Sequence, residues 1–297
     1  MKLVSVIIPC YNCELYVEEA VRSIINQTYQ NLEILVINDG SSDKTESILL
    51  KLSEEDSRVK YIKNKENIRL IATLNKGLSL ANGEYIARMD ADDISLPSRI
   101  EKQVAFLEEN SDVAICGTNS LHIDENNMII GHSLMPQDDK AVKIFAKYAS
   151  PFIHPSVMLR AEQIKGFSYD ANYIHAEDFK LWLDILAEYK GYNLKERLIA
   201  YRYISTSISH TFSDIQQQKA KELTKPDSEF LSFITQLEDY KVCVPLYAKI
   251  IKRNKFNFNN YLSLKTLHRF MPVVVYYAFY KLKYKFLKKK LRVGNGN

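Results

Sequence analysis

Residues 34–43 (ILVINDGSSD) and 84–93 (EYIARMDADD) each consist of an apolar run that ends in aspartates. Continuous apolar runs of this kind are typical of strands buried on both faces, as in a parallel sheet. Carboxylates at the C-terminal ends of such strands gather at the edge where open α/β sheets bind ligands. Asp90, Asp92 and Asp93 would repel one another unless a cation or several hydrogen-bond donors lay among them. The two segments therefore predict a ligand site, and a divalent metal is its simplest occupant.

Strand and helix patterns alternate over the first hundred residues. Ser41, Ser42 and Asp43 are suited to cap one of the helices, and Pro97 suits the first turn of another. The alternation predicts an α/β fold with a doubly wound, mainly parallel sheet. The strand patterns are at 4–8, 34–37, 59–62 and 85–89, and the helical patterns are at 14–26, 43–53, 70–82 and 97–109.

The pattern changes after residue 113. Shorter strands and a polar helix near 138–148 are followed by a helix that begins at Glu177 and a strand at 198–204. Beyond residue 212 the sequence is helical in pattern. The helix after Glu177 has apolar residues at the spacing of one helical face, namely Phe179, Trp182, Leu183 and Leu186.

These changes predict one α/β domain at 1–211, with halves at 1–110 and 111–211, and a helical extension at 212–297. Charge supports the division. The chain has 40 Lys and Arg and 36 Asp and Glu, and residues 241–297 contain 14 of the basic residues and none of the acidic ones. The preceding part of the chain therefore has a net charge of −10. An acidic body with a basic end indicates two separate tasks, and the basic end is not expected to form the active site.

The N-terminus and the cysteines indicate a cytoplasmic protein. The apolar run in MKLVSVIIPCYN is too short for a signal peptide and lacks a cleavage site of small residues. Four cysteines are few for 297 residues, as expected in a reducing compartment. Cys10 and Cys13 form a C-x-x-C pattern, but no second pair completes a zinc site, so we interpret them as part of an ordinary loop.

Common nucleotide-binding loops are missing after the first strand pattern. The sequence there is IIPCYNCELY, with neither G-x-G-x-x-G nor a Walker loop. Pro9 and Tyr11 instead place a rigid turn and an aromatic ring at the expected site, where the ring could stack on a base. Asp39 could accept a hydrogen bond from an imide N–H. The aspartates after Met89 could hold a hard cation against phosphate oxygens.

Together these stretches resemble family 2 glycosyltransferases of the GT-A fold. The resemblance spans about residues 3–204 and does not cover the C-terminal third. Any one of the stretches is weak alone, but their order along the chain is specific. They are VSVIIPCYN, Gln27-Thr28-Tyr29 with LEILVINDGSSD, GLSLANGEYIARMDADD, HPSVMLR and HAEDFKLWLDI.

The resemblance implies a nucleotide-sugar-binding half at 1–110 and an acceptor half at 111–211. It implies Mn²⁺ or Mg²⁺ as cofactor, held by Asp92, and Asp178 as general base. Many family members have Gly at the position of Arg69, and we interpret this arginine as a contact to the donor pyrophosphate. The remaining implied donor contacts are Pro9, Tyr11, Asp39 and Asp90, and the implied acceptor-side residues are His154, Glu177 and Trp182.

Several of these residues could instead have a purely structural role. The residues at 41–43 could simply form a turn and cap, and Asp93 could cap the following segment or bind metal. Glu177 and Asp178 could favour the positive end of their helix. Trp182 lies on the apolar face of that helix, which favours the core.

The sequence thus predicts an inverting transferase that moves a hexose from a UDP-sugar to a glycan or diphospholipid-linked sugar. UDP-glucose or UDP-galactose is favoured by analogy, with a β-glycosidic product in O-antigen, lipopolysaccharide or capsule synthesis. One alternative is a sugar nucleotidyltransferase, which would have a glycine-rich basic loop after its first strand. The other is a non-catalytic nucleotide- or sugar-binding homologue at the membrane, which would need no base.

The C-terminal tail predicts a membrane contact. Residues 270–280 are mostly apolar but span only about half of the roughly 20 residues that cross a bilayer. Cations interleaved with aromatic and aliphatic residues follow at 281–292. Such a segment can lie on an anionic surface, so we expect a peripheral position on the inner face of the cell membrane. A nucleic-acid partner is not expected, because the acidic body would oppose it.

Overall fold

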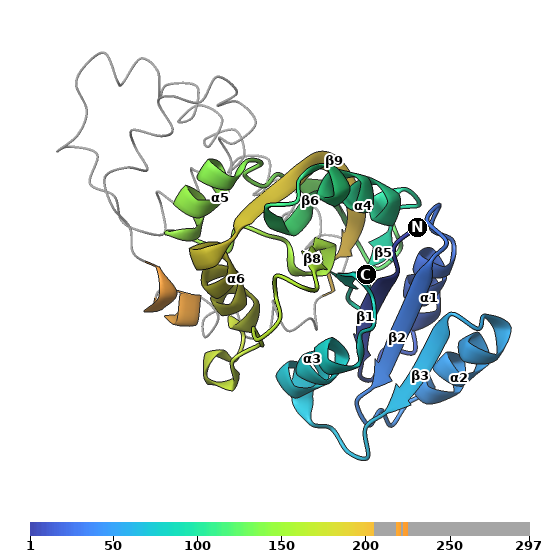
Figure 1. Cartoon of the computed structure of the whole chain (residues 1–297). Helices are drawn as coiled ribbons and strands as arrows, with labels where there is room; N and C mark the ends of the chain where they lie inside the picture. Colours follow the sequence, from blue (N-terminus) through green and yellow to red (C-terminus); the bar gives the residue numbers. More distant parts are fainter. Residues whose placement is uncertain (205–217, 221, 225–297) are drawn as a thin grey trace, which may run out of the picture. The chain divides into compact units, whose positions relative to one another are not determined.

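The structure of the protein, a computed structural model, describes residues 1–204, 218–220 and 222–224 of the chain (Figure 1). Helices and strands alternate through the first half, as the sequence pattern predicts. In chain order the elements are β1 (Val4–Cys10), α1 (Val17–Ile25), β2 (Leu32–Asn38), α2 (Thr45–Glu55), β3 (Val59–Lys63), α3 (Arg69–Leu80), β4 (Tyr85–Arg88), β5 (Ile94–Ser95), α4 (Arg99–Glu109), β6 (Val113–Ile123), β7 (Ile129–Ser133), α5 (Asp139–Ala146), the 3₁₀ helix η1 (His154–Ser156), β8 (Met158–Arg160), the 3₁₀ helix η2 (Ala171–Tyr173), α6 (Glu177–Glu188) and β9 (Lys190–Arg202).

Within the described residues, nine strands form one sheet. Its order is β3-β2-β1-β4-β8-β6-β9-β5, and β7 pairs with β6. The first four strands are parallel, and β6 and β9 are parallel as well. The short strand β8 joins the two parallel groups by antiparallel pairs with β4 and β6. Most paired residues are therefore in parallel pairs, and the predicted α/β class with a mainly parallel sheet is confirmed.

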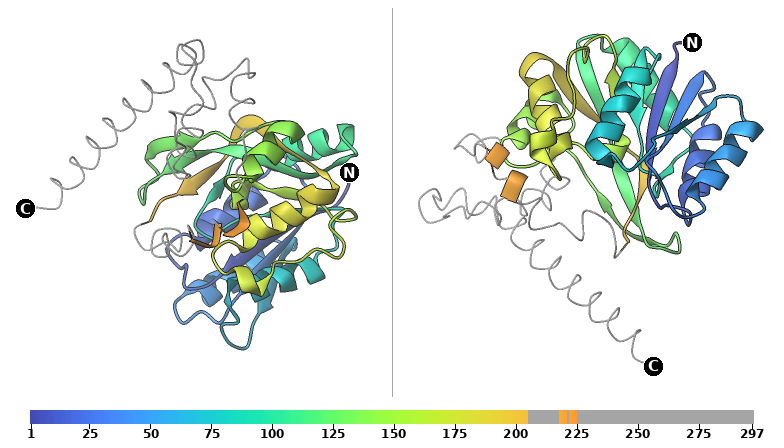
Figure 2. Two further views of the ribbon diagram at one scale, coloured as in Figure 1. Left: turned by 90° about the vertical axis from the view of Figure 1, so that its left-hand side faces the viewer. Right: turned by 90° about the horizontal axis from the view of Figure 1, so that it is seen from below.

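Helices cover both faces of this sheet (Figure 2). Val4, Val6 and Ile8 of β1 pack in one apolar layer with helices α1, α2 and α4. Ile7 points to the other layer, which contains residues of α3, α5 and α6. Because successive side chains of a strand alternate between the faces, a strand covered on both sides is apolar throughout. This double burial explains the continuous apolar runs of the sequence.

The parallel strands end at a common edge, where the predicted site residues follow. Cys10 at the end of β1 is in register with Asn38 at the end of β2, and the Asp39 amide donates to the Cys10 carbonyl over 2.8 Å. The amide of Met89, just after β4, donates to the carbonyl of Ile7 over 3.1 Å. The segments that follow β1 and β2 therefore meet, and the segment that follows β4 begins beside β1 at the same edge of the sheet.

Two elements differ from expectation. Helix α4 begins at Arg99 rather than at Pro97, because the Pro97 carbonyl accepts the amide of Thr28 over 2.9 Å and stays in the preceding turn. Strand β9 begins at Lys190, directly after α6, and is much longer than the predicted strand at 198–204. Its first part is hard to detect in the sequence because it contains polar residues such as Asn193, which is fully buried and donates to two backbone carbonyls.

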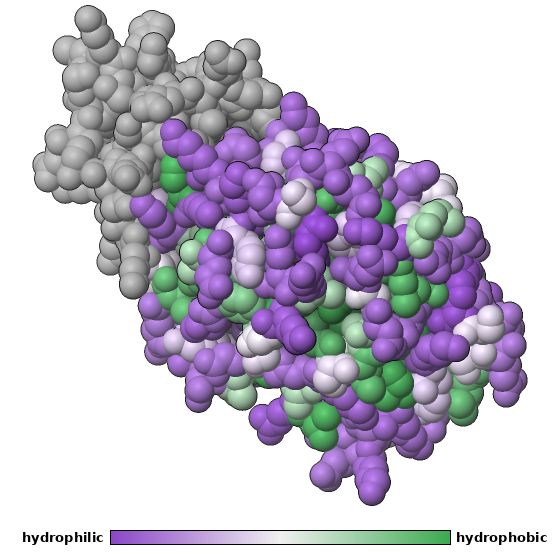
Figure 3. Space-filling view, viewed as in Figure 1, coloured by the Kyte–Doolittle hydropathy of each residue, from purple (hydrophilic) through white to green (hydrophobic). Residues whose placement is uncertain are grey.

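Hydrophilic side chains cover most of the described surface on the face in Figure 3, and apolar ones gather toward its middle. No helix among the described residues is both long enough and apolar enough to span a membrane. Residues 218–220 and 222–223 are helical. Apart from Thr224, the remainder of the predicted extension at 212–297, including the basic tail, lies outside the described residues.

Candidate active site

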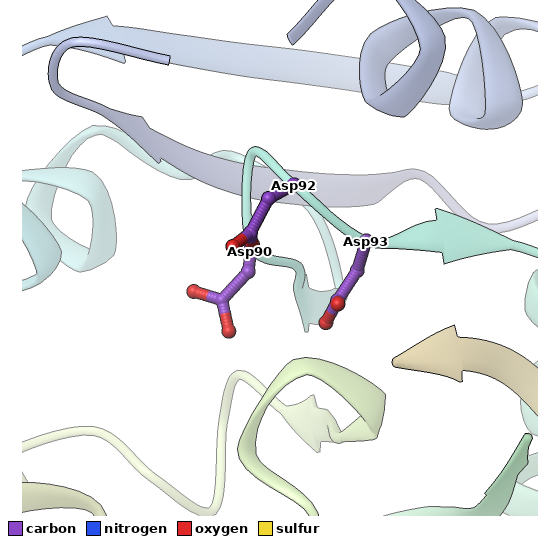
Figure 4. A group of neighbouring side chains, drawn as sticks. All are labelled: Asp90, Asp92 and Asp93. Carbon is purple, nitrogen blue, oxygen red and sulfur yellow. The ribbon is translucent and has the colours of Figure 1, made fainter. Parts of the chain in front are cut away.

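Three carboxylates gather in the loop between β4 and β5. Each of Asp90, Asp92 and Asp93 offers an oxygen within 4.8 Å of the others, and Figure 4 shows the three side chains turned to the same side of the loop. Burial and the neighbouring Asp90 raise the pKa of Asp92 to about 7. Burial and both neighbouring aspartates also raise the pKa of Asp93. In the described part of the chain, Asp93 Oδ2 is buried without a hydrogen-bond partner.

This arrangement fits a divalent cation. Hard cations select carboxylate oxygens, and a cation would offset the repulsion that raises these pKa values. The sequence left two roles open for Asp93. Its Oδ1 accepts the amide of Arg202 over 2.8 Å, so this carboxylate holds the end of β9 and does not cap the segment that follows it.

Arg88 is a central residue that sequence reasoning missed. It ends β4, its side chain is only 5% exposed, and it forms an ion pair with Asp90. Its Nε and Nη1 atoms have no acceptor among the described residues. A charged residue inside the apolar run EYIARM could have been noticed, because buried arginines are rare without a partner.

The predicted uracil-binding residues lie at the ends of β1 and β2. Tyr11 is 51% exposed, so its ring is accessible for stacking, while Asp39 is only 4% exposed. Asp39 Oδ1 accepts from Asn64 Nδ2 over 2.8 Å and from the amide of Ile68 over 2.9 Å. Asn64 was not found from the sequence. It is itself held by Lys76 Nζ over 2.6 Å, and this chain of hydrogen bonds orients the Asp39 carboxylate.

A reciprocal set of hydrogen bonds joins the loops after β1 and β2. The amide of Asn12 donates to Ser41 Oγ over 3.1 Å, and Asn12 Oδ1 accepts the amide of Ser42 over 2.9 Å. Asp43 accepts the amides of both Glu14 and Thr45 over 3.0 Å. The residues at 41–43 do not take the N-cap position of α2, which is Lys44, although Asp43 accepts the amide of the first residue of this helix. They fix the loop that carries Tyr11 relative to the strand that carries Asp39.

Arg69 begins α3 on the exposed side of this region. Its φ of 70° is in the left-handed region, which glycine adopts without the steric cost that a side chain brings. This conformation suits the glycine that the family resemblance implies at this position. Strained backbone of this kind clusters at functional sites. The exposed guanidinium remains consistent with the predicted donor contact.

The second group of carboxylates begins α6. Glu177 is 7% exposed and Asp178 is partly exposed. Burial and the charge of Glu177 raise the pKa of Asp178 to about 7, and burial also raises the pKa of Glu177. Within the described residues Glu177 Oε2 has no hydrogen-bond partner. Asp178 thus keeps some exposure and has a pKa near neutrality, which is compatible with the general-base role, and that role stays a prediction.

His154 and Trp182 lie in the layer behind these carboxylates. Their rings meet edge to face with centroids 5.7 Å apart, and His154 Nε2 is 2.9 Å from the hydroxyl of Tyr169. Burial and the charge of Arg88 lower the pKa of His154, so its ring is neutral. Trp182 is fully buried, and its Nε1 has no partner in the described part of the structure. Their predicted acceptor-side roles stay predictions.

Comparisons with known proteins give a consistent result. A family model described as "Glycosyl transferase family 2" matches residues 5–172. An uncharacterized glycosyltransferase of Haemophilus influenzae is 37% identical over 236 residues, 75% of this chain and 72% of that protein. The Escherichia coli protein WfgD, a UDP-Glc:alpha-D-GlcNAc-diphosphoundecaprenol beta-1,3-glucosyltransferase, is 32% identical over 223 residues, 75% of this chain and 83% of its own.

Solved structures of other proteins share the fold of this chain. The crystal structure of S. aureus TarS 1-349 in complex with UDP-GlcNAc superimposes with a TM-score of 0.62 at 18% identity, over 89% of this chain and 76% of that one. This likeness confirms the GT-A fold that the sequence predicts.

Proposed function

The chain belongs to glycosyltransferase family 2, and on that premise we propose that it is an inverting, metal-dependent hexosyltransferase. Its donor is a UDP-sugar, with UDP-glucose or UDP-galactose favoured, and its acceptor is a sugar hydroxyl on a lipid-linked oligosaccharide. The product is a β-glycosidic bond in a bacterial surface polysaccharide. The activity of the relative WfgD, which transfers glucose from UDP-Glc to a GlcNAc-diphosphoundecaprenol, supports this choice of donor and acceptor.

The observation that carries the proposal is that Arg88 pairs with one group of carboxylates and is close enough for its charge to act on the other. Arg88 forms an ion pair with Asp90, and its charge opposes the rise in pKa that burial causes at Asp92 and Asp93 and also at Glu177 and Asp178. A cation site for a diphosphate and a base for a hydroxyl are therefore close together. Transfer of a sugar from a nucleotide to an alcohol needs both groups.

The nucleotide-sugar-binding half at 1–110 binds the donor. The ring of Tyr11 stacks on uracil beside Pro9, while Asp39 accepts from the base. Asp90 contacts the ribose, and Arg69 offers a guanidinium to the diphosphate. Asp92 would hold the cation, with the free oxygen of Asp93 beside it. When bound, Mn²⁺ or Mg²⁺ would supply Lewis-acid stabilisation of the charge that develops on the leaving diphosphate.

Asp178 provides the proton acceptor for the reaction. The acceptor oxygen forms a bond to the anomeric carbon as the bond from that carbon to the diphosphate oxygen breaks. The hydroxyl proton passes to the Asp178 carboxylate, and UDP leaves with the bonding electrons. Attack from the face opposite the diphosphate inverts the configuration, so an α-linked donor yields a β-glycoside.

Transfer should depend on pH with a limb near pH 7. The pKa of Asp178 is raised to about 7 by burial and by Glu177, so the carboxylate is protonated and inactive below that pH. We expect kcat/KM to fall about tenfold per pH unit below 7 and to level off above it. Glu177→Gln removes the neighbouring charge and should move the limb to lower pH.

Glu188→Gln is the matched control for this shift. Glu188 is exposed at the other end of the same helix and should leave the limb in place. The profiles are measured from pH 5.5 to 8.5 at saturating Mn²⁺. A limb that shifts equally in both variants, or a rate that is flat across this range, would contradict the assignment of the base.

A panel of donors tests the function itself. The purified protein is incubated with Mn²⁺, a synthetic GlcNAc-α-diphospholipid and UDP-glucose, UDP-galactose, UDP-GlcNAc or GDP-mannose in turn. We expect mass spectrometry to detect one added hexose with UDP-glucose or UDP-galactose. Transfer from GDP-mannose alone would refute the donor proposal. Binding of UDP without transfer or donor hydrolysis would favour the non-catalytic alternative.

The basic tail is proposed to dock the enzyme on the cytoplasmic leaflet. Its sequence supports this, with seven Lys or Arg within 281–292 and about 1 kcal/mol for each cation near an anionic surface. Deleting residues 270–297 should release the protein from phosphatidylglycerol vesicles at low salt and spare donor hydrolysis. Replacing Lys288, Lys289 and Lys290 with Gln should weaken sedimentation partially. Equal sedimentation of all three proteins would rule the docking role out.

A further inference from the structure

Arg202, at the end of β9, makes an unusually dense set of contacts around the aspartate loop. Its side chain is only 1% exposed. Its Nε donates to the backbone carbonyl of Asp92 over 2.7 Å, and its amide donates to Asp93 Oδ1 over 2.8 Å. One residue therefore holds both the main chain and a side chain of the carboxylate group, from a position 110 residues away in sequence.

The outer part of the guanidinium is anchored just as firmly. Its Nη1 donates to the carbonyl of Asp124 over 3.1 Å and to Asn127 Oδ1 over 2.6 Å. Its Nη2 pairs with Glu19 Oε2 over 2.8 Å. The other oxygen of Glu19 accepts from Asn127 Nδ2 over 2.9 Å, so the three side chains form a closed triangle.

An aromatic ring completes the enclosure. The guanidinium carbon lies 4.5 Å from the ring centre of Tyr16, which precedes α1. Helix α1, the turn between β6 and β7, and the end of β9 thus meet on one arginine. The sheet brings it there, since β5 pairs with β9 in the register that aligns Ile94 with Ala200, and continuing this register places Asp92 opposite Arg202.

We propose that Arg202 is a positioning residue for the cation site. This inference rests on the metal-dependent function proposed above. The arginine does not touch the cation. Arg202 holds the Asp92 carbonyl through its side chain and one oxygen of Asp93 through its amide. These two contacts orient the Asp92 carboxylate and the free oxygen of Asp93 toward the cation site. Residues that orient ligands in this way typically contribute about 10- to 100-fold to metal affinity.

The arrangement separates this role from nucleotide binding. No hydrogen bond within the described residues joins Arg202 to Tyr11, Asp39 or Asn64. Metal affinity should therefore respond to Arg202, while metal-free UDP binding should not. A residue that only stabilised the fold would affect both together.

The experiment measures Mn²⁺ binding directly, from the loss of the free Mn²⁺ electron paramagnetic resonance signal in the presence of UDP. Arg202→Met should bind Mn²⁺ about 10- to 100-fold more weakly than wild type and keep its metal-free UDP affinity by calorimetry. Arg202→Lys retains the charge but not the four hydrogen bonds, and should fall between the two. Excess Mn²⁺ should restore transfer in Arg202→Met.

Arg160→Met is the matched control. Arg160 also donates to several backbone carbonyls, but it pairs with Tyr85 at the opposite end of β4 from the aspartates. It should leave Mn²⁺ affinity unchanged. If Arg202→Met does not fold, Glu19→Gln weakens the same triangle from its exposed side and should lower Mn²⁺ affinity by a smaller factor.

Unchanged Mn²⁺ affinity in the folded Arg202 variant, or in Glu19→Gln where that variant replaces it, would overturn the proposal. An equal loss in Arg160→Met, or a parallel loss of metal-free UDP binding, would also overturn it. The outcomes that overturn the role of Arg202 can be distinguished from a failure of the proposed function. In that case the wild-type protein would itself neither bind Mn²⁺ with UDP nor require it for transfer.

Discussion

Asp178→Asn is expected to reduce transfer by about 10²- to 10⁴-fold while UDP binding stays intact. The amide has nearly the shape of the carboxylate but cannot accept the proton of the acceptor hydroxyl. Asp178 is the second residue of α6, whereas the residues assigned to the uracil base lie at the ends of β1 and β2. Product formation and calorimetry with UDP measure the two effects separately. A variant that keeps more than about a tenth of wild-type turnover would sink the assignment of the base.

Thermal unfolding shows whether Asp178→Asn loses transfer because the base is missing or because the fold is weakened. The pKa of Asp178 is about 7 in the folded protein because of burial and Glu177, well above the value of about 3.9 in an unfolded chain. Because this pKa is raised, the contribution of Asp178 to the free energy of unfolding is fully present below about pH 4 and is lost as pH rises through 7. Asp178→Asn avoids this loss. It should unfold at a higher temperature than wild type at pH 8, with the difference narrowing toward pH 4.

Asp92→Ala is expected to abolish metal-dependent donor binding and with it transfer. Removing a carboxylate ligand should weaken Mn²⁺ binding by more than about 100-fold, the upper range for residues that only orient a ligand. The protein should stay folded, since the substitution also relieves repulsion from Asp90 and Asp93. UDP affinity is measured by calorimetry with and without Mn²⁺, and only the gain due to Mn²⁺ should disappear.

Asp39→Ala is the comparison for that result. Loss of a hydrogen bond to a charged group should weaken UDP binding about 10- to 100-fold, by the same factor with and without Mn²⁺. Transfer by the wild-type protein should stop in EDTA and return with Mn²⁺. If EDTA leaves wild-type transfer unchanged, the metal role is wrong whatever the variants show.

The sheet and the edge at which the site lies could be predicted from local patterns. Buried parallel strands require apolar side chains on both faces, so β1, β2 and β4 appear in the sequence as continuous apolar runs. The residue that follows each run must then lie at the ligand-binding edge. Asp39 and Asp90 could be placed in this way because their positions depend on the ends of adjacent strands. The first part of β9 could not, because its polar residues hide the strand pattern.

The contacts that hold the site depended on the tertiary structure. Asn64 holds Asp39, Arg88 pairs with Asp90, and Arg202 holds the loop of Asp92. The first and third pairs are 25 and 110 residues apart, and strand register and loop packing bring them together. The pKa of Asp178 likewise follows from burial and from Glu177, and the depth of burial is a property of the folded environment. Local periodicity thus determined which residues reach the edge of the sheet. Only three-dimensional packing decided how they are held and charged, because hydrogen bonding and desolvation depend on neighbours in space.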